Sequence, residues 1–195
     1  DVQTGERRWH FQIHHSDQWN YDIPTAPILL DLTVDGRQIP ALIQNTKQGL
    51  VFAFNRETGE PIWPINETPF PASNVPGEKL VATQPIPSKP APYDMQGLDI
   101  DGLVDFTPEI RAQAIAAVAD FQLGPLFNPP MERGNSQGKL AAMVCPSGAV
   151  NITHPPVADP TTAIMYVTSR SGCGSRVLVT GEEADTYYEK PTGVT

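Results

Sequence analysis

Long apolar runs are missing from this sequence. No stretch approaches the roughly 20 consecutive apolar residues that a membrane-spanning helix requires, so the sequence predicts no such helix. Basic residues are also few, since 13 Lys and Arg stand against 22 Asp and Glu and give a formal net charge of −9. A chain of this charge lacks the positive surface that attracts nucleic acids or anionic lipids. We therefore discount nucleic acid and anionic membrane surfaces as partners.

Cysteine is scarce as well, with Cys145 and Cys173 as the only two. Such a pair can be two buried thiols in a cytosolic chain or a disulfide in an exported one, and the spacing does not decide between them. The chain also lacks an initiator Met and a signal-type segment, and it begins at Asp1 in what reads as the middle of a turn-and-strand unit. We therefore expect residues 1–195 to be a fragment of a longer protein.

Proline and glycine, in contrast, are plentiful, with 21 and 15 residues. Average proline usage is about 5%, so the composition indicates many turns and short strands and disfavours a helical bundle. Hydrophobic residues make up 39% of the chain and charged residues 18%, which fits a folded chain rather than a disordered one.

Short β-type runs alternate with turn signals over the first third of the chain. The Asp35-Gly36 pair between two such runs predicts a hairpin. Strands at a spacing of about ten residues are typical of a sandwich, a barrel or a propeller. The runs are Trp9–Ile13, Ile28–Val34, Ile39–Gln44, Leu50–Phe54 and Ile62–Trp63.

A turn motif repeats within this region. Thr58-Gly59 precedes Trp63, and Thr4-Gly5 precedes Trp9 at the same offset. A repeated turn followed by an indole is what propeller blades would show, with one indole per blade closing the packing between neighbouring sheets.

The second part of the chain changes character. We read the proline-rich stretch Pro64–Pro92 as an extended, ordered loop. A helix is predicted over Thr107–Phe121, because Thr107 can cap it and apolar residues recur at helical spacing. The β pattern then resumes at Leu140–Val144, Ile164–Thr168 and Arg176–Thr180. The predicted fold is therefore all-β with one inserted helix.

The polar residues of the first sixty positions have ordinary explanations when each is taken alone. A metal site could be read from His14, His15, Asp17 and Asp22, but their spacing is not that of a zinc site. Lys47 could be a solvated turn lysine beside Gly49.

Taken together, the motifs carry more information than any one of them. In chain order they are Trp9-His10-Phe11-Gln12, His14-His15, Trp19-Asn20-Tyr21-Asp22, Lys47-Gln48-Gly49, Arg56-Glu57-Thr58-Gly59, Thr83-Gln84-Pro85 and Gly124-Pro125-Leu126-Phe127. This order resembles the catalytic region of quinoprotein dehydrogenases, the pyrroloquinoline quinone (PQQ) enzymes of the glucose, quinate and alcohol type. A downstream segment with Cys145, Asn151 and Cys173 is similar to a methanol dehydrogenase region in which two cysteines are bridged.

The resemblance implies that residues 1–195 are part of an eight-bladed β-propeller with PQQ and Ca²⁺ on its axis. It implies an enzyme that oxidises an alcohol, polyol or sugar hydroxyl and passes electrons to ubiquinone or cytochrome c. It also implies a periplasmic location, with attachment to the inner membrane through an N-terminal part as an option.

The resemblance also assigns roles to single residues. Asn20 stands where the family has an aspartate that acts as base and helps hold the metal, and Lys47 stands where a cation binds the quinone oxygens. Asn151 corresponds to a residue that contacts the cofactor, and Cys145 and Cys173 are expected to form a disulfide.

Asn20 raises a chemical problem, because a carboxamide oxygen can ligate Ca²⁺ but is too weakly basic to take a proton from an alcohol. Asp17 or Asp22 could supply the missing base, and strand alternation would put Asp22 on the same face as Asn20. One alternative is a non-catalytic propeller that acts as a binding or assembly module. A second is an unrelated β-rich carbohydrate-binding domain.

Overall fold

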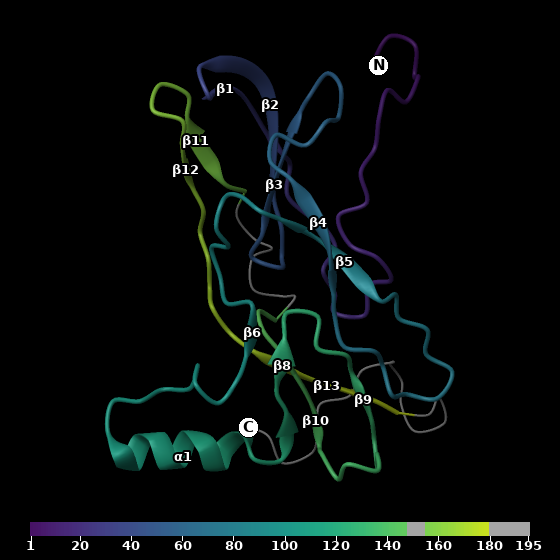
Figure 1. The fold of residues 1–195 in the computed structure, drawn as a ribbon, viewed down its shortest axis with the longest axis vertical. Helices are drawn as coiled ribbons and strands as arrows, with labels where there is room; N and C mark the ends of the chain where they lie inside the picture. Colours follow the sequence, from purple (N-terminus) through teal and green to yellow (C-terminus); the bar gives the residue numbers. More distant parts are fainter. Residues whose placement is uncertain (148–154, 180–195) are drawn as a thin grey trace.

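Short strands dominate the computed structural model, which describes residues 1–147 and 155–179 (Figure 1). One α-helix occurs within these ranges. The fold class predicted from the sequence, all-β with one inserted helix, is confirmed. No helix in the described part of the chain is both long and apolar enough to cross a membrane.

The first sheet is an antiparallel meander in the order β1-β2-β3. It is formed by β1 (Ile28–Val34), β2 (Arg37–Asn45) and β3 (Val51–Asn55). Asp35 and Gly36 both have positive φ angles, 50° and 74°, as a two-residue hairpin of the primed type requires. The predicted hairpin is therefore confirmed.

Two predicted strands of this region are wrong. Residues 9–13 form no strand; instead the Phe11 ring packs against Phe52 and Phe54, with centroids 5.9 and 4.9 Å apart. Ile62 donates one backbone hydrogen bond to Ala53, at 2.9 Å, without extending the sheet. Apolar side chains in these segments are explained by packing rather than by strand pairing.

The proline-rich stretch contains a hairpin that the sequence interpretation missed. It is made of β4 (Ile65–Pro69) and β5 (Thr83–Pro87), which pair antiparallel. A two-stranded ribbon leaves alternate N–H groups unpaired along each outer edge, so it tolerates proline at those positions. Pro85 and Pro87 are two positions apart in β5 and therefore share such an edge.

A second, larger sheet has the order β7-β10-β13-β9. Its central pair, β10 and β13, is antiparallel, and the outer strands run parallel to their neighbours. Two small ribbons, β6 with β8 and β11 with β12, complete the fold. The bounds are β6 (Gly97–Leu98), β7 (Phe121–Gln122), β8 (Gly124–Pro125), β9 (Met131–Glu132), β10 (Ala141–Val144), β11 (Val157–Asp159), β12 (Ile164–Tyr166) and β13 (Gly174–Leu178).

The three predicted late strands correspond to β10, β12 and β13. β13 begins earlier than predicted, at Gly174, and Thr180 lies outside the described residues.

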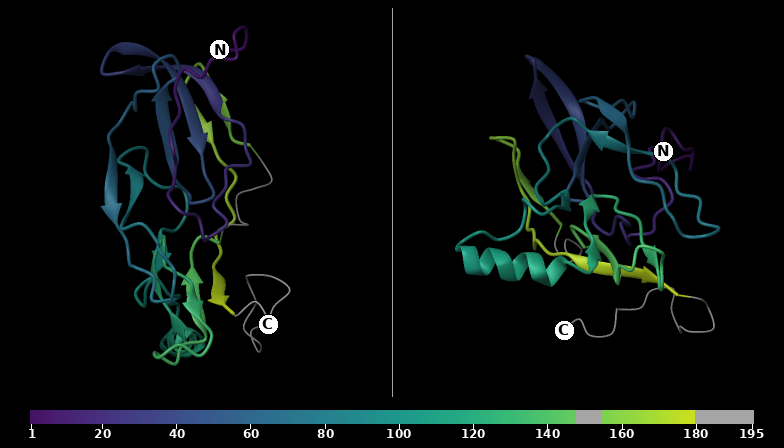
Figure 2. Two further views of the ribbon diagram at one scale, coloured as in Figure 1. Left: turned by 90° about the vertical axis from the view of Figure 1, so that its right-hand side faces the viewer. Right: turned by 60° about the horizontal axis from the view of Figure 1, so that its bottom comes forward.

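Helix α1 (Pro108–Val118) begins at the predicted residue, where the Thr107 hydroxyl accepts from the Ile110 N–H at 3.3 Å. It ends before the predicted Phe121, which belongs to β7. None of its residues is buried, and the helix lies apart from the first sheet (Figure 1, Figure 2). The recurring apolar residues therefore do not form a buried face in this structure.

Two apolar clusters cover opposite faces of the first sheet. The larger one joins aromatic side chains of residues 9–21 to β3 and to the loop after β8, and includes Trp19, Tyr21, Phe52, Phe54 and Phe127. The smaller one contains Leu30, Leu32, Ala41, Ile43, Val51 and Ala53. Residues 14–22 are thus attached to a packed core.

Trp9 closes over the turn that precedes Glu60. Its indole N–H donates to the Arg56 carbonyl at 3.0 Å, and a Cβ added at Gly59 would meet the ring at 2.6 Å. Glycine is therefore required at this turn. Trp9 therefore packs on the turn that follows β3, and its expected role in closing the packing between neighbouring sheets stays a prediction.

Candidate functional site

Lys47 lies in a tight turn between β2 and β3. The turn residues 46–49 are all buried, and 3% of the Lys47 side chain is exposed. Gly49 has a φ of 75°, and its N–H donates to the Thr46 carbonyl at 3.1 Å. A buried ammonium group must be paired, so the neighbours of this amine define the site.

The Lys47 amine contacts two of the predicted site residues. It lies 2.5 Å from Asp22 Oδ1 and 3.3 Å from Asn20 Oδ1. Asp22 is the exposed member of the ion pair, with 60% of its side chain accessible. The structure therefore brings together Asn20, Asp22 and Lys47, with the carboxylate open to solvent.

Asn20 and Asp22 reach the amine from a loop and not from a strand. The expectation of strand alternation is wrong, because Asn20 has a φ of 65°, in the left-handed region that asparagine tolerates. Trp19 and Tyr21 are 1% and 0% exposed and anchor the loop. Trp19 Nε1 donates to the Asn128 carbonyl and the Tyr21 hydroxyl to the Pro146 carbonyl, both at 2.7 Å.

Asp17 organises this loop. Its carboxylate accepts the backbone N–H groups of Trp19 and Tyr21 at 2.9 and 2.8 Å. Burial alone would raise the pKa of Asp17, but the hydrogen bond with His14 and these two N–H donors hold it below its ordinary value. Of the two candidate bases, Asp22 contacts Lys47, whereas Asp17 caps the loop.

A polar chain links this loop to the Lys47 turn from a second side. His14 Nε2 lies 3.6 Å from Asp17, and His14 Nδ1 lies 3.2 Å from the side-chain amide of Gln48. Gln48 is 1% exposed, and its Oε1 atom has no hydrogen-bond partner. Gln48 belongs to the Lys47-Gln48-Gly49 motif, yet only the fold shows that it contacts His14.

The two histidines serve different neighbours. The His15 ring is 3.2 Å from Glu67 Oε1, while His14 faces Asp17 and Gln48. Within residues 1–147 and 155–179, no group of three or more His, Cys, Asp or Glu side chains could hold a metal ion. The two adjacent histidine rings therefore contact different side chains.

The donor set around Lys47 fits part of a cofactor and metal site. The amine can donate to anionic or quinone oxygens, and the oxygens of Asn20 and Asp22 are ligands that a hard cation prefers. Asn151, the other predicted cofactor contact, lies outside the described residues. An open pocket of about 740 Å³ lies elsewhere, beside β6 and β8, and none of the three residues lines it.

The expected disulfide between Cys145 and Cys173 is present. It ties the end of β10 to the segment that leads into β13.

Comparisons with known proteins agree with these features. The family model described as PQQ, "Glucose/ethanol/alcohol dehydrogenase, beta-propeller domain", matches residues 1–193. Among curated relatives, the glycerol dehydrogenase large subunit of Gluconobacter thailandicus is 47% identical over 87 residues, which are 44% of this chain and 12% of that protein. The quinoprotein glucose dehydrogenase of Escherichia coli (strain K12) is 32% identical over 139 residues, 67% of this chain and 16% of that protein.

A solved structure shares the fold. A europium-containing methanol dehydrogenase superposes with a TM-score of 0.51 and 20% identity, over 91% of this chain and 23% of the other. This chain thus spans a small part of each of these proteins.

Proposed function

Because this chain belongs to the PQQ-dependent family of glucose, ethanol and alcohol dehydrogenases, we propose that the protein carrying it oxidises an alcohol, polyol or sugar hydroxyl with PQQ. The chain is part of a β-propeller, and eight blades remain a prediction. Membership of this family removes the alternative of an unrelated carbohydrate-binding domain.

One observation carries the proposal: a buried lysine amine lies within contact distance of Asn20 and Asp22. When bound, PQQ supplies a quinone carbonyl that accepts hydride from the substrate carbon. Lys47 would hold the quinone oxygens by charge and hydrogen bonding. Its burial excludes water from the amine, which strengthens that interaction.

Asp22 is the proposed base. The Asn20 carboxamide cannot take a proton, whereas the Asp22 carboxylate is exposed and contacts the same amine. Asp22 would take the hydroxyl proton, and the hydride would go to the quinone carbonyl that bound PQQ supplies, so that the substrate would leave as a carbonyl compound. Asn20 has the remaining role of an oxygen ligand.

Ca²⁺ is the proposed metal. It takes roughly six to eight oxygen ligands, of which Asn20 would supply one. A carboxamide in place of a carboxylate removes one negative charge, and this favours a divalent over a trivalent ion. The europium named for the similar methanol dehydrogenase makes a lanthanide the second candidate.

A periplasmic location and electron transfer to ubiquinone or cytochrome c complete the proposal. The disulfide supports the location, because disulfides persist in oxidising compartments.

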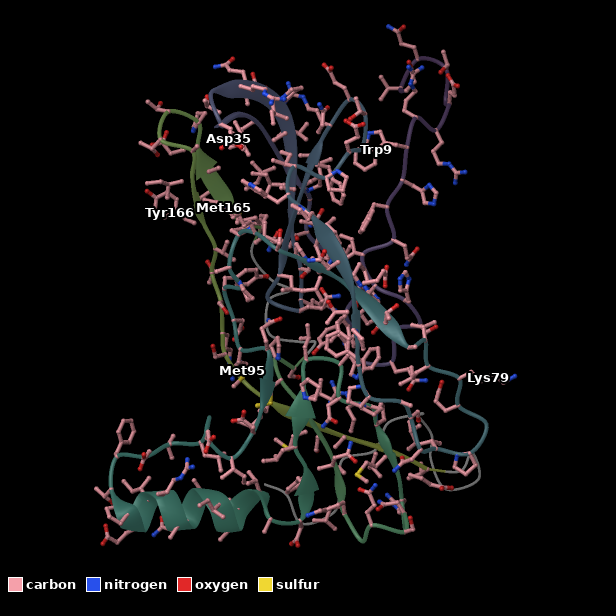
Figure 3. All side chains as sticks on the ribbon, viewed as in Figure 1. Trp9, Asp35, Lys79, Met95, Met165 and Tyr166 are labelled. Carbon is pink, nitrogen blue, oxygen red and sulfur yellow. A yellow bond between two sulfur atoms is a disulfide. The ribbon has the colours of Figure 1, made fainter. Side chains whose placement is uncertain are left out.

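The test is reconstitution of the full-length protein with PQQ and Ca²⁺, following dye reduction with glycerol, glucose and quinate. Lys47→Met should lower turnover by at least ~100-fold. Lys79→Met is the matched control, because Lys79 is exposed and lies at the edge of the molecule (Figure 3). If wild type is inert and Asn20→Asp is active, the protein is the alternative, a non-catalytic propeller that has lost its base.

A further inference from the structure

The Lys47 turn is covered by a segment that is distant in sequence. Residues 93–96, the clamp segment, contact the turn at three points. The Tyr93 N–H donates to the Gly49 carbonyl at 2.9 Å, and the Gln96 side-chain amide donates to the Gln48 carbonyl at 2.7 Å. The Tyr93 hydroxyl donates to the Thr46 carbonyl, and burial raises the pKa of Tyr93 to about 12.

Asp94 lies directly against the backbone of this turn. A Cβ atom added at Gly49 would meet Asp94 Cβ at 2.7 Å, so no space separates the two segments. Any displacement of Asp94 therefore disturbs the packing against the backbone of the turn that carries Lys47.

The carboxylate of Asp94 contacts a third segment, residues 169–171. Its two oxygens accept the hydroxyls of Ser169 and Ser171 at 2.6 and 2.8 Å. Hydrogen bonds to a carboxylate are stronger than those between neutral groups. These serines therefore anchor the clamp segment to residues 169–173.

Residues 169–173 are fixed in turn by the disulfide. Cys173 is bonded to the buried Cys145, and the Ser147 N–H donates to the Gly172 carbonyl at 2.8 Å. Cys173 also lies 3.7 Å from the Met95 sulfur, and Met95 is drawn beside the yellow disulfide in Figure 3. Contacts thus run from the disulfide through Asp94 to the Lys47 turn.

We propose that Asp94 is a positioning residue for Lys47. Through Asp94, residues 169–173 hold in place the turn that presents the amine. This inference rests on the proposed function, in which Lys47 binds PQQ. The side chain that holds the amine, Asp22, is mostly exposed, so the amine depends on its backbone for a fixed position. The clamp segment supplies that support.

The test uses Ser169→Ala/Ser171→Ala in the full-length protein, which removes both hydroxyl donors and leaves Asp94 and the turn unchanged. Thr162→Ala is the matched control, because it removes a hydroxyl that donates to Asp159 at 2.8 Å on an exposed turn. The readout is PQQ affinity by absorbance titration, which needs no turnover. We expect the double variant to lose about 10-fold in affinity and the control to lose none.

A cycle with Lys47→Met separates positioning from general loosening of the fold. If Asp94 acts through Lys47, the serine substitutions should change PQQ affinity by less than ~2-fold in the Lys47→Met background. An equal loss in both backgrounds would overturn the positioning role. The positioning role would also be overturned if Ser169→Ala/Ser171→Ala bound PQQ with wild-type affinity while Lys47→Met alone bound it weakly. Wild-type affinity in Lys47→Met would instead refute the proposed function.

Discussion

The Lys47 turn and helix α1 are both short segments, yet the molecule holds them in opposite ways. Every residue of the turn 46–49 is buried, and its partners include Asp22, Tyr93 and Gln96, which lie far away in sequence. Helix α1 buries no residue and begins at its own cap, Thr107. The signals that mark the helix are therefore local, whereas long-range contacts form the site.

This difference predicts where substitutions should matter. A change in the turn disturbs a close-packed region shared by several segments, and the cost should be large. An equivalent change in α1 affects side chains that are not buried, so the loss in the free energy of unfolding should be small.

The largest expected contrast in stability is between Leu50→Ala and Ile115→Ala. Leu50 is 2% exposed and Ile115 is 39% exposed. Truncation of the buried leucine should lower the free energy of unfolding by about 3 kcal/mol, and truncation of the helix residue by less than about 0.5 kcal/mol. Urea unfolding of the two variants measures both values. Equal losses would show that α1 is packed as tightly as the turn.

A smaller contrast is expected between Gly49→Ala and Gly77→Ala. Both glycines have positive φ angles, 75° and 85°, but a Cβ at Gly49 would meet Asp94 at 2.7 Å while one at Gly77 would meet nothing within 4 Å. Gly77→Ala should cost about 1 kcal/mol from backbone strain alone. Gly49→Ala should cost about 2 kcal/mol or more and weaken PQQ binding. Unfolding curves give the loss of stability in each variant, and PQQ titrations give the loss of affinity. Equal losses in the two variants would contradict the prediction.

The smallest effect concerns pH and the loop that carries Asn20. The fold lowers the pKa of Asp17. The contribution of the ionised carboxylate to the free energy of unfolding is therefore complete when the pH lies above the ordinary pKa of aspartate, and it is lost as the pH falls through the lowered pKa. Its side chain is 27% exposed, and solvent screening limits the effect to about 0.5 kcal/mol.

Asp17→Asn should therefore be less stable than wild type at pH 7, with a gap that narrows below about pH 4. Urea midpoints at several pH values would show it. Asp105→Asn in the exposed segment before α1 controls for the loss of one charge. A gap that widens in acid would refute the role of Asp17 as an ionised cap.

The sequence predicted what depends on local chemistry. The Asp35-Gly36 hairpin and the Thr107 cap follow from backbone preferences of single residues. The β4–β5 hairpin was missed, because proline tolerance at a ribbon edge depends on which N–H groups face outward in the pairing.

The site was predicted in part for a similar reason. Asn20 and Lys47 were found through a family resemblance, and Asp22 through the search for a base to replace the family aspartate. The fold brings all three together, although not by the strand alternation that the sequence predicted. Asp94 gave no such signal, because its partners Ser169 and Ser171 lie 75 and 77 positions away. Contacts of that range appear only when the chain is folded.

The central claim is that Asp22 replaces the base that Asn20 cannot provide, and its direct test is the turnover number of Asp22→Asn after reconstitution with PQQ and Ca²⁺. Asp31→Asn is the control, because Asp31 is a similarly exposed aspartate in an ion pair, 2.9 Å from Arg56. We predict a loss of about 100-fold or more for Asp22→Asn with PQQ still bound, and partial recovery in Asn20→Asp/Asp22→Asn. Wild-type turnover in Asp22→Asn would contradict the claim.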